Sequence, residues 1–387
     1  MLKVYIGVVL FAASFFNYAE TNEINVGKFE TVKSTILNDS KKVMISLPDY
    51  YDANDYSYPV LYFTDASHHF FTMASTVHFL TRSDLIPPMI VVGIDSGKHR
   101  TRDLTPQLSA QTLNTSKRYS SENSGGADKF IQFIGTELIP HINKQYRTAD
   151  FNVFAGHSLG GLFSLYVLAN HSSFFDGFIS VSPSLWWDEE RLFNDIKQQV
   201  GQNNFPKKPL FMSKGSEQGP METTYQTLAD LFEVDKRELV STKKFPEENH
   251  LTVVFKAYYE GLQAIFSQWV LPYKEGAKGL DVVKAHNKKV KSLFNLNFTS
   301  ERWLVNLGNS ELNSKKRYDK AIAAFSLNTE LFPQSAYSYF QLAKALEAKN
   351  DLVSAFENYK KANDLVPESY YTKHIYQENL KRIKALL

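Results

Sequence analysis

The segment Gly156-His157-Ser158-Leu159-Gly160 has the residue types and the spacing of a serine nucleophile on a sharp turn. Glycines two positions before and two positions after Ser158 leave room for such a turn. An apolar run precedes the segment and a run of helical period follows it, as the motif requires. The pattern predicts that Ser158 attacks an acyl carbon and that the Leu159 N–H helps to bind the oxyanion.

A serine nucleophile needs a histidine base, which follows it in the chain of an α/β-hydrolase. His171 stands at the end of the helix that begins at the motif, about 20 Å from Ser158 along the helix axis, which excludes it. His250 is the other histidine after Ser158 within residues 20–272. It lies in a polar run between a candidate strand and a helix, so we expect His250 to be the base.

The acid that orients the histidine is expected on the loop after the strand at residues 210–213. Residues 214–220 form this loop, and Glu217 is their one acidic residue. Glu222 is an alternative, although it also suits the first turn of a helix, where the helix dipole favours an acid. In a third interpretation Glu217 is a solvated loop charge and the site is completed otherwise.

A second oxyanion donor is expected from residues 64–69, where the small residues Ala66 and Ser67 permit close approach of the backbone. His68 and His69 follow in the same loop. They do not predict a metal site, because adjacent histidines of an extended segment point apart and no further ligand spacing accompanies them.

Trp186 and Trp187 follow the strand expected at residues 178–181, at the end of a parallel sheet where ligands bind. We expect both tryptophans, together with His68, to line a substrate pocket. Packing in the core is an equal alternative for the tryptophans.

Short apolar runs alternate with longer segments of helical period from Phe29 to about Phe266, which predicts a mostly parallel sheet flanked by helices. The expected strands are residues 42–47, 60–64, 89–94, 152–155, 178–181 and 210–213. The expected helices are residues 128–145, 159–170, 189–200, 225–233 and 252–266.

The chain after Pro272 is lysine-rich and carries a repeat. Three residue pairs recur at a spacing of 34, namely Ala321 with Ala355, Phe325 with Tyr359, and Pro333 with Pro367. This period predicts tetratricopeptide repeats, and the first repeat fits if one residue is inserted around residues 315–317. We expect a hydrolase domain at residues 20–272, a helical linker at 273–298 and a small all-α repeat domain at 299–387.

Residues 1–19 have the pattern of an export signal, with Lys3 before an apolar stretch too short to span a bilayer. We therefore expect a periplasmic or secreted protein without a transmembrane segment in the mature chain. The chain has no cysteine, which excludes disulfides and thiol catalysis. Its 43 basic and 41 acidic residues nearly balance, so no overall field favours nucleic acid.

Four stretches resemble the esterase D-like family, which includes enterochelin and other siderophore esterases, S-formylglutathione hydrolases, feruloyl esterases and mycolyltransferases. They are residues 156–161, 100–106, 125–140 and 182–188. The resemblance covers about residues 29–266 and implies an α/β-hydrolase fold, cleavage of carboxylic esters without a cofactor, and catalytic roles for Ser158 and His250. Many relatives carry Asp-Gly in the oxyanion loop, where this chain has Asp65-Ala66.

We therefore predict a carboxylic-ester hydrolase that uses a Ser158, His250 and Glu217 triad, an acyl-enzyme, no metal and no cofactor. Its substrate is a small-molecule ester, with siderophore, aryl and acyl esters as candidates. One alternative is an acyltransferase with the same triad, in which an alcohol replaces water. The other is an interaction protein with a vestigial hydrolase, whose repeats bind a protein or a peptide.

Overall fold

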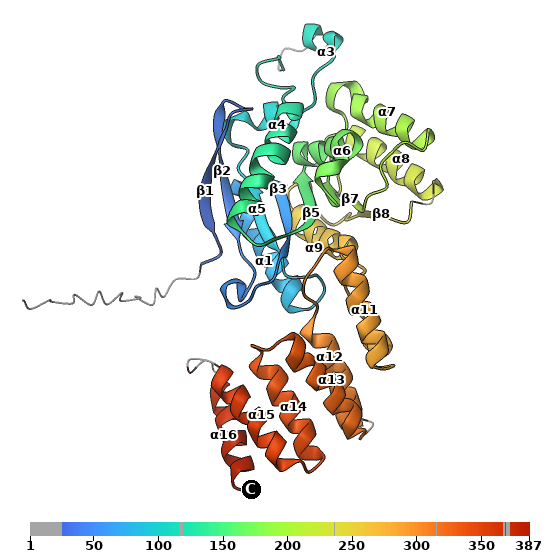
Figure 1. Ribbon diagram of the computed structural model, residues 1–387. Helices are drawn as coiled ribbons and strands as arrows, with labels where there is room; N and C mark the ends of the chain where they lie inside the picture. Colours follow the sequence, from blue (N-terminus) through green and yellow to red (C-terminus); the bar gives the residue numbers. More distant parts are fainter. Residues whose placement is uncertain (1–24, 116–118, 236, 315, 367, 369–371) are drawn as a thin grey trace, which may run out of the picture.

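The computed structural model describes residues 25–387 apart from residues 116–118, 236, 315, 367 and 369–371. The expected export signal therefore lies outside the described residues, as does Pro367 of the repeat. No helix in the described part of the chain is long and apolar enough to cross a membrane. An α/β part is followed by a C-terminal helical array, defined here as residues 301–384 (Figure 1).

An eight-stranded sheet forms the centre of the α/β part, in the order β1-β2-β4-β3-β5-β6-β7-β8. The pairs β1–β2 and β2–β4 are antiparallel, and all the other pairs are parallel. The strands are β1 (Lys28–Ser34), β2 (Asp39–Ser46), β3 (Tyr58–Thr64), β4 (Ile90–Ile94), β5 (Thr148–His157), β6 (Gly177–Val181), β7 (Leu210–Lys214) and β8 (Val240–Lys244). The six expected strands are confirmed with somewhat different ends, β8 is the candidate strand before His250, and β1 is additional.

Helices cover both faces of the sheet, which is why its central strands are buried throughout and mostly apolar. Side chains of a strand alternate between the two faces. On β6, the Ser180 hydroxyl donates to the Gly161 carbonyl of α6, whereas Ile179 faces Gly261 of α9. The helices of this part are α1 (Ala66–Arg82), α2 (Arg100–Leu104), α3 (Ala110–Thr115), α4 (Ala127–Phe133), α5 (Ile139–Gln145), α6 (Leu159–His171), α7 (Trp187–Gly201), α8 (Pro220–Val234) and α9 (Val253–Ile265).

The five expected helices are confirmed. The prediction of a loop at residues 64–69 is wrong, because a helix begins within this segment. Helix α1 begins at Ala66, directly after Asp65, whose φ of 60° is left-handed. Its buried residues recur with helical period and include Phe70, Met73 and Val77. His68 and His69 therefore lie in the first turn of a helix rather than in an extended segment.

The chain continues after α9 as α10 (Tyr273–Gly276) and α11 (Leu280–Leu293), and then as the helical array. The array consists of α12 (Glu301–Asn309), α13 (Tyr318–Leu331), α14 (Ala336–Ala348), α15 (Leu352–Leu365) and α16 (Lys373–Lys384), each packed on the next. The starts of α13 and α15 are 34 residues apart, and those of α12 and α14 are 35 apart. A π-helical turn at Ser310–Ser314 accommodates an extra residue. The helical period agrees with the sequence, and assignment to the tetratricopeptide class stays a prediction.

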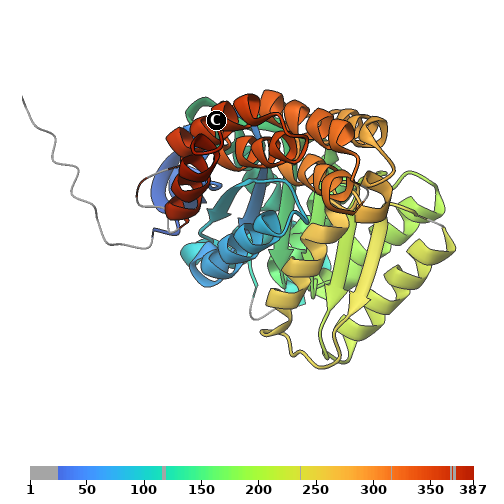
Figure 2. The same cartoon turned by 90° about the horizontal axis from the view of Figure 1, so that it is seen from below.

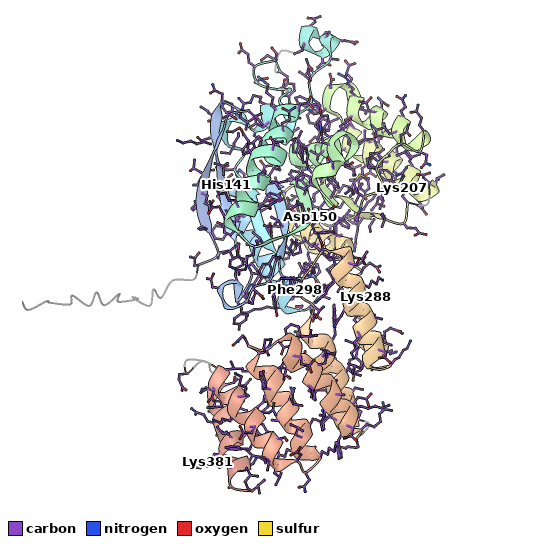
Figure 3. All side chains as sticks on the ribbon, in the orientation of Figure 1. His141, Asp150, Lys207, Lys288, Phe298 and Lys381 are labelled. Carbon is purple, nitrogen blue, oxygen red and sulfur yellow. The ribbon has the colours of Figure 1, made fainter. Side chains whose placement is uncertain are left out.

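The array is joined to the α/β part by a shared aromatic core. Phe298 stacks on Tyr56 at 4.9 Å between ring centroids, and Trp269 contacts Trp303 at 5.0 Å. Figure 3 shows Phe298 at the junction of the two parts. Residues 273–298 are therefore a packed connection, because their buried apolar residues belong to the main core.

This junction lies at the amino ends of the parallel strands. Tyr58, the first residue of β3, contacts Phe298, and Phe151 near the start of β5 contacts Phe294. Seen from below, the array runs across the near end of the α/β part (Figure 2). Since Ser158 follows the last residue of β5, the array lies at the opposite end of the sheet from the predicted nucleophile.

Trp303→Ala should lower the free energy of unfolding by about 3–5 kcal/mol, because it removes a large buried side chain and leaves a cavity between the two parts. Urea unfolding followed by circular dichroism measures the change. Tyr337→Ala is the matched control, since Tyr337 is 45% exposed on the array. Equal stability of the two variants would show that the junction contributes little to the fold.

Candidate active site

Ser158 occupies a strained turn between β5 and α6. Its backbone has φ 60° and ψ −115°, as expected for a nucleophile presented at the end of a strand. The Ser158 N–H donates to the Val181 carbonyl at 2.9 Å, which ties the turn to β6. A Cβ on Gly156 would collide with the Gly160 carbonyl, so the motif glycine is required by the close approach of the two backbone segments.

Gly156→Ala should therefore destabilise the protein by about 3 kcal/mol, since neither backbone segment is free to move aside. Gly201→Ala is the control, because a Cβ there meets no atom within 4 Å. We expect the control to change stability by no more than about 1 kcal/mol. Thermal unfolding of both variants checks the difference, and a Gly156→Ala protein of unchanged stability would contradict the described turn.

His250 and Glu217 meet beside this turn. His250 Nδ1 lies 2.7 Å from Glu217 Oε1, although the two residues come from separate loops after β8 and β7. The loops are joined by a hydrogen bond from the Ser216 N–H to the Glu248 carbonyl at 2.7 Å. A Cβ on Gly215 would lie 2.6 Å from the same carbonyl oxygen, so this residue keeps the loops close.

Glu217 is ionised at neutral pH. Burial of its carboxylate opposes ionisation, but the hydrogen bond with His250 and the nearby Ser182 hydroxyl outweigh burial and lower the pKa of Glu217 to about 2. The runner-up Glu222 lies instead in the first turn of α8 and forms ion pairs with Lys214 and Lys244. The structure thus brings Glu217, not Glu222, to the histidine.

The Ser158 hydroxyl lies 3.3 Å from the hydroxyl of Ser184. Among the described residues, no hydrogen bond joins Ser158 Oγ to His250, and such contacts commonly tighten when a substrate binds. Ser184 is also held to the turn by its N–H, which donates to the Ser158 carbonyl at 3.1 Å. No motif in the sequence indicates the role of Ser184, because this contact depends on the pairing of β5 with β6.

Two helix N-termini converge on the turn. Leu159 is the first residue of α6 and Ala66 is the first residue of α1. The two segments are close, since a Cβ on Gly160 would collide with the Thr64 hydroxyl. Backbone N–H groups at helix N-termini favour bound negative charge. Leu159 and Ala66 are therefore suitably placed as donors, while Ser67 is exposed at the next position.

An ion pair fixes the loop before α1. Arg100 donates to both carboxylate oxygens of Asp65, from Nε at 2.7 Å and Nη2 at 2.8 Å. The Asp65 N–H donates to the Ser96 hydroxyl at 3.1 Å. These contacts hold Asp65 in its left-handed conformation, so Arg100 has a structural part in shaping the predicted oxyanion loop.

The residues predicted to line a pocket have different environments. Trp187 is 2% exposed and packs on Tyr119 at 4.6 Å between ring centroids, as a core residue does. Trp186 is 38% exposed and His68 is exposed, so both can contact a ligand. Within the described ranges, no three His, Cys, Asp or Glu side chains are grouped to hold a metal.

Two further histidines extend this cluster, because His157 lies beside His250 and His69 lies beside His157. The His157 ring is 4.6 Å from the His250 ring and 5.6 Å from the His69 ring, measured between centroids. The motif predicts no role for His157, because it allows any residue before the serine.

Comparison with known proteins identifies the family. Residues 34–259 match the family described as "Putative esterase". The ferri-bacillibactin esterase BesA of Bacillus subtilis is 30% identical over 191 residues, which are 46% of this chain and 66% of BesA. The siderophore triacetylfusarinine C esterase of Aspergillus fumigatus is 26% identical over 204 residues, or 44% of this chain and 66% of that protein. The chain thus spans slightly less than two thirds of either relative.

Among solved structures, an IroE-like serine hydrolase from Shewanella oneidensis superposes with a TM-score of 0.68 at 24% identity. The superposition covers 79% of this chain and 99% of that structure, which shows a common fold. Since the family model spans more than half of the sequence, this chain, with its α/β-hydrolase fold, belongs to the Putative esterase family.

Proposed function

We propose that this protein is a serine hydrolase that cleaves carboxylic esters, with Ser158 as nucleophile, His250 as base and Glu217 as the acid that orients it. The observation that carries the proposal is the 2.7 Å contact between Glu217 and His250 Nδ1, beside a serine on a strained turn. Because Nδ1 is held by the carboxylate, Nε2 of the same imidazole is left to accept the serine proton.

The reaction follows from this arrangement. As Ser158 Oγ attacks the ester carbonyl carbon, its proton passes to His250 Nε2, and the N–H groups of Leu159 and of Ala66 or Ser67 hold the oxyanion. Collapse of the intermediate breaks the ester bond, and His250 returns the proton to the departing alcohol. Water then attacks the acyl-enzyme by the same steps and releases the acid. Glu217 stays ionised throughout and stabilises the imidazolium.

The relatives named as siderophore esterases support a siderophore ester as the substrate of this chain. The exposed Trp186, two residues after Ser184, is positioned to contact an aryl or acyl group bound at Ser158. His68 lies in the first turn of the neighbouring α1 and is also open to such a group.

A comparison of substrates tests the proposal. We expect purified protein to hydrolyse a siderophore trilactone with a higher kcat/KM than 4-nitrophenyl acetate, as measured by chromatography of the released acids. Ser158→Ala protein serves as the blank. Added acceptor alcohols should leave the acid as the main product, whereas a transferase would give new esters. Hydrolysis of neither substrate would contradict the proposed activity.

A further inference from the structure

His157 connects the strand that carries the nucleophile to the loop that carries the base. Its Nε2 lies 2.7 Å from the backbone carbonyl oxygen of His250, and its side chain is buried, with 5% of the residue exposed. A carbonyl oxygen only accepts hydrogen bonds, so Nε2 must carry the hydrogen and donate it. The neutral tautomer of His157 with hydrogen on Nε2 follows from this contact.

The surroundings of His157 keep it neutral. Burial is the main cause that lowers its pKa, to about 3, and the charges of the neighbouring His250 and His69 rings act in the same direction. The hydrogen bond to the His250 carbonyl raises the pKa but does not outweigh burial. Asp65 at the start of α1 acts in the opposite direction, but its carboxylate is paired with Arg100. At the pH values where His250 accepts and returns a proton, His157 therefore places no second positive charge beside it.

We propose that His157 is a positioning residue: its Nε2–H holds the backbone of His250 and thereby sets the distance between the imidazole and Ser158. The inference rests on the proposed function. His157 is the last residue of β5, which is paired on both sides with β3 and β6, and it directly precedes Ser158. A donor at this position fixes the base relative to the same rigid strand that presents the nucleophile.

The other contacts of the histidine loop do not perform this task. The Glu217 carboxylate binds Nδ1 and orients the ring, but Glu217 lies on the loop after β7. The bond from the Ser216 N–H to the Glu248 carbonyl also joins the two loops to each other. Among the described hydrogen bonds, His157 alone ties the His250 backbone to β5. Misplacement of a catalytic group by about 1 Å can lower a rate about 100-fold.

A matched pair of variants tests the role. His157→Gln keeps an N–H donor near the position of Nε2, whereas His157→Met has a similar length without a donor. The readout is the rate of covalent labelling by a fluorophosphonate probe over a range of probe concentrations and pH. We expect His157→Met to lower the maximal labelling rate about 100-fold with little change in the concentration for half-maximal rate. His157→Gln should recover most of that loss.

Thermal unfolding of each variant separates positioning from packing, and His171→Met controls for the exchange of a histidine outside the site. If His157→Met does not fold, His157→Asn takes its place, because its donor is too short to reach the His250 carbonyl. Wild-type protein that is not labelled would overturn the proposed function and this inference with it. Labelled wild type with an equally reactive His157→Met, or a His157→Gln as slow as His157→Met, would overturn the positioning role alone.

Discussion

Ser158→Ala is expected to lower kcat for ester hydrolysis by about 10⁶-fold, because the variant has no atom that can form the acyl-enzyme. The turn itself should survive, since it is set by the Ser158 backbone and by Gly156 rather than by the hydroxyl. KM should change little, as the ground-state contacts of the ester remain. Steady-state kinetics with purified protein measure both quantities.

Ser75→Ala is the matched control for this result. Ser75 is exposed on α1, and its hydroxyl donates only to the backbone carbonyl of Thr72, at 3.1 Å. We expect wild-type kinetics from the control and wild-type thermal stability from both variants. A Ser158→Ala protein that keeps more than about a hundredth of the wild-type kcat would assign the nucleophile to another residue.

Glu217→Gln is expected to lower kcat about 10⁴-fold while leaving the fold intact. The amide has nearly the shape of the carboxylate, but it carries no charge to stabilise the imidazolium of His250. It also no longer forces the hydrogen onto Nδ1, where the 2.7 Å contact with Glu217 requires it. Both the magnitude of kcat and its dependence on pH should therefore change.

Glu222→Gln is the informative comparison, because sequence alone left Glu222 as the alternative acid. Its carboxylate pairs with the buried Lys214 and with the exposed Lys244, so its loss should lower the free energy of unfolding but leave kcat near the wild-type value. The opposite ranking of the two variants would transfer the role of the acid to Glu222.

The parts of the site that sequence predicts are those that local chemistry determines. Ser158 is identified by a five-residue motif whose glycines are needed within the turn itself. His250 and Glu217 follow because the chain order of a hydrolase leaves few candidates on the correct loops. In the structure Glu217 contacts His250 Nδ1 and Ser158 occupies a strained turn, while their joint role as a triad stays a prediction.

Other parts of the site and of the fold depend on contacts between segments that are distant in the chain, and these contacts cannot be predicted from the sequence. The contact of Ser184 with Ser158 arises from the pairing of β5 with β6, and that of His157 with His250 from the approach of the loop after β8. Strand β8 is an exposed edge without an alternating apolar pattern, so the sequence indicates it only as a candidate strand before His250. The first turn of α1 contains Ser67, His68 and His69, and these polar residues shortly after β3 are also typical of a loop.

The site of covalent modification tests the central claim most directly. Wild-type protein is incubated with a fluorophosphonate probe, its intact mass is measured, and the modified peptide is sequenced by tandem mass spectrometry. We predict one adduct per chain, located on Ser158, and no adduct on Ser158→Ala protein. An adduct on another residue, or equal labelling of the two proteins, would contradict the assignment of Ser158 as the nucleophile.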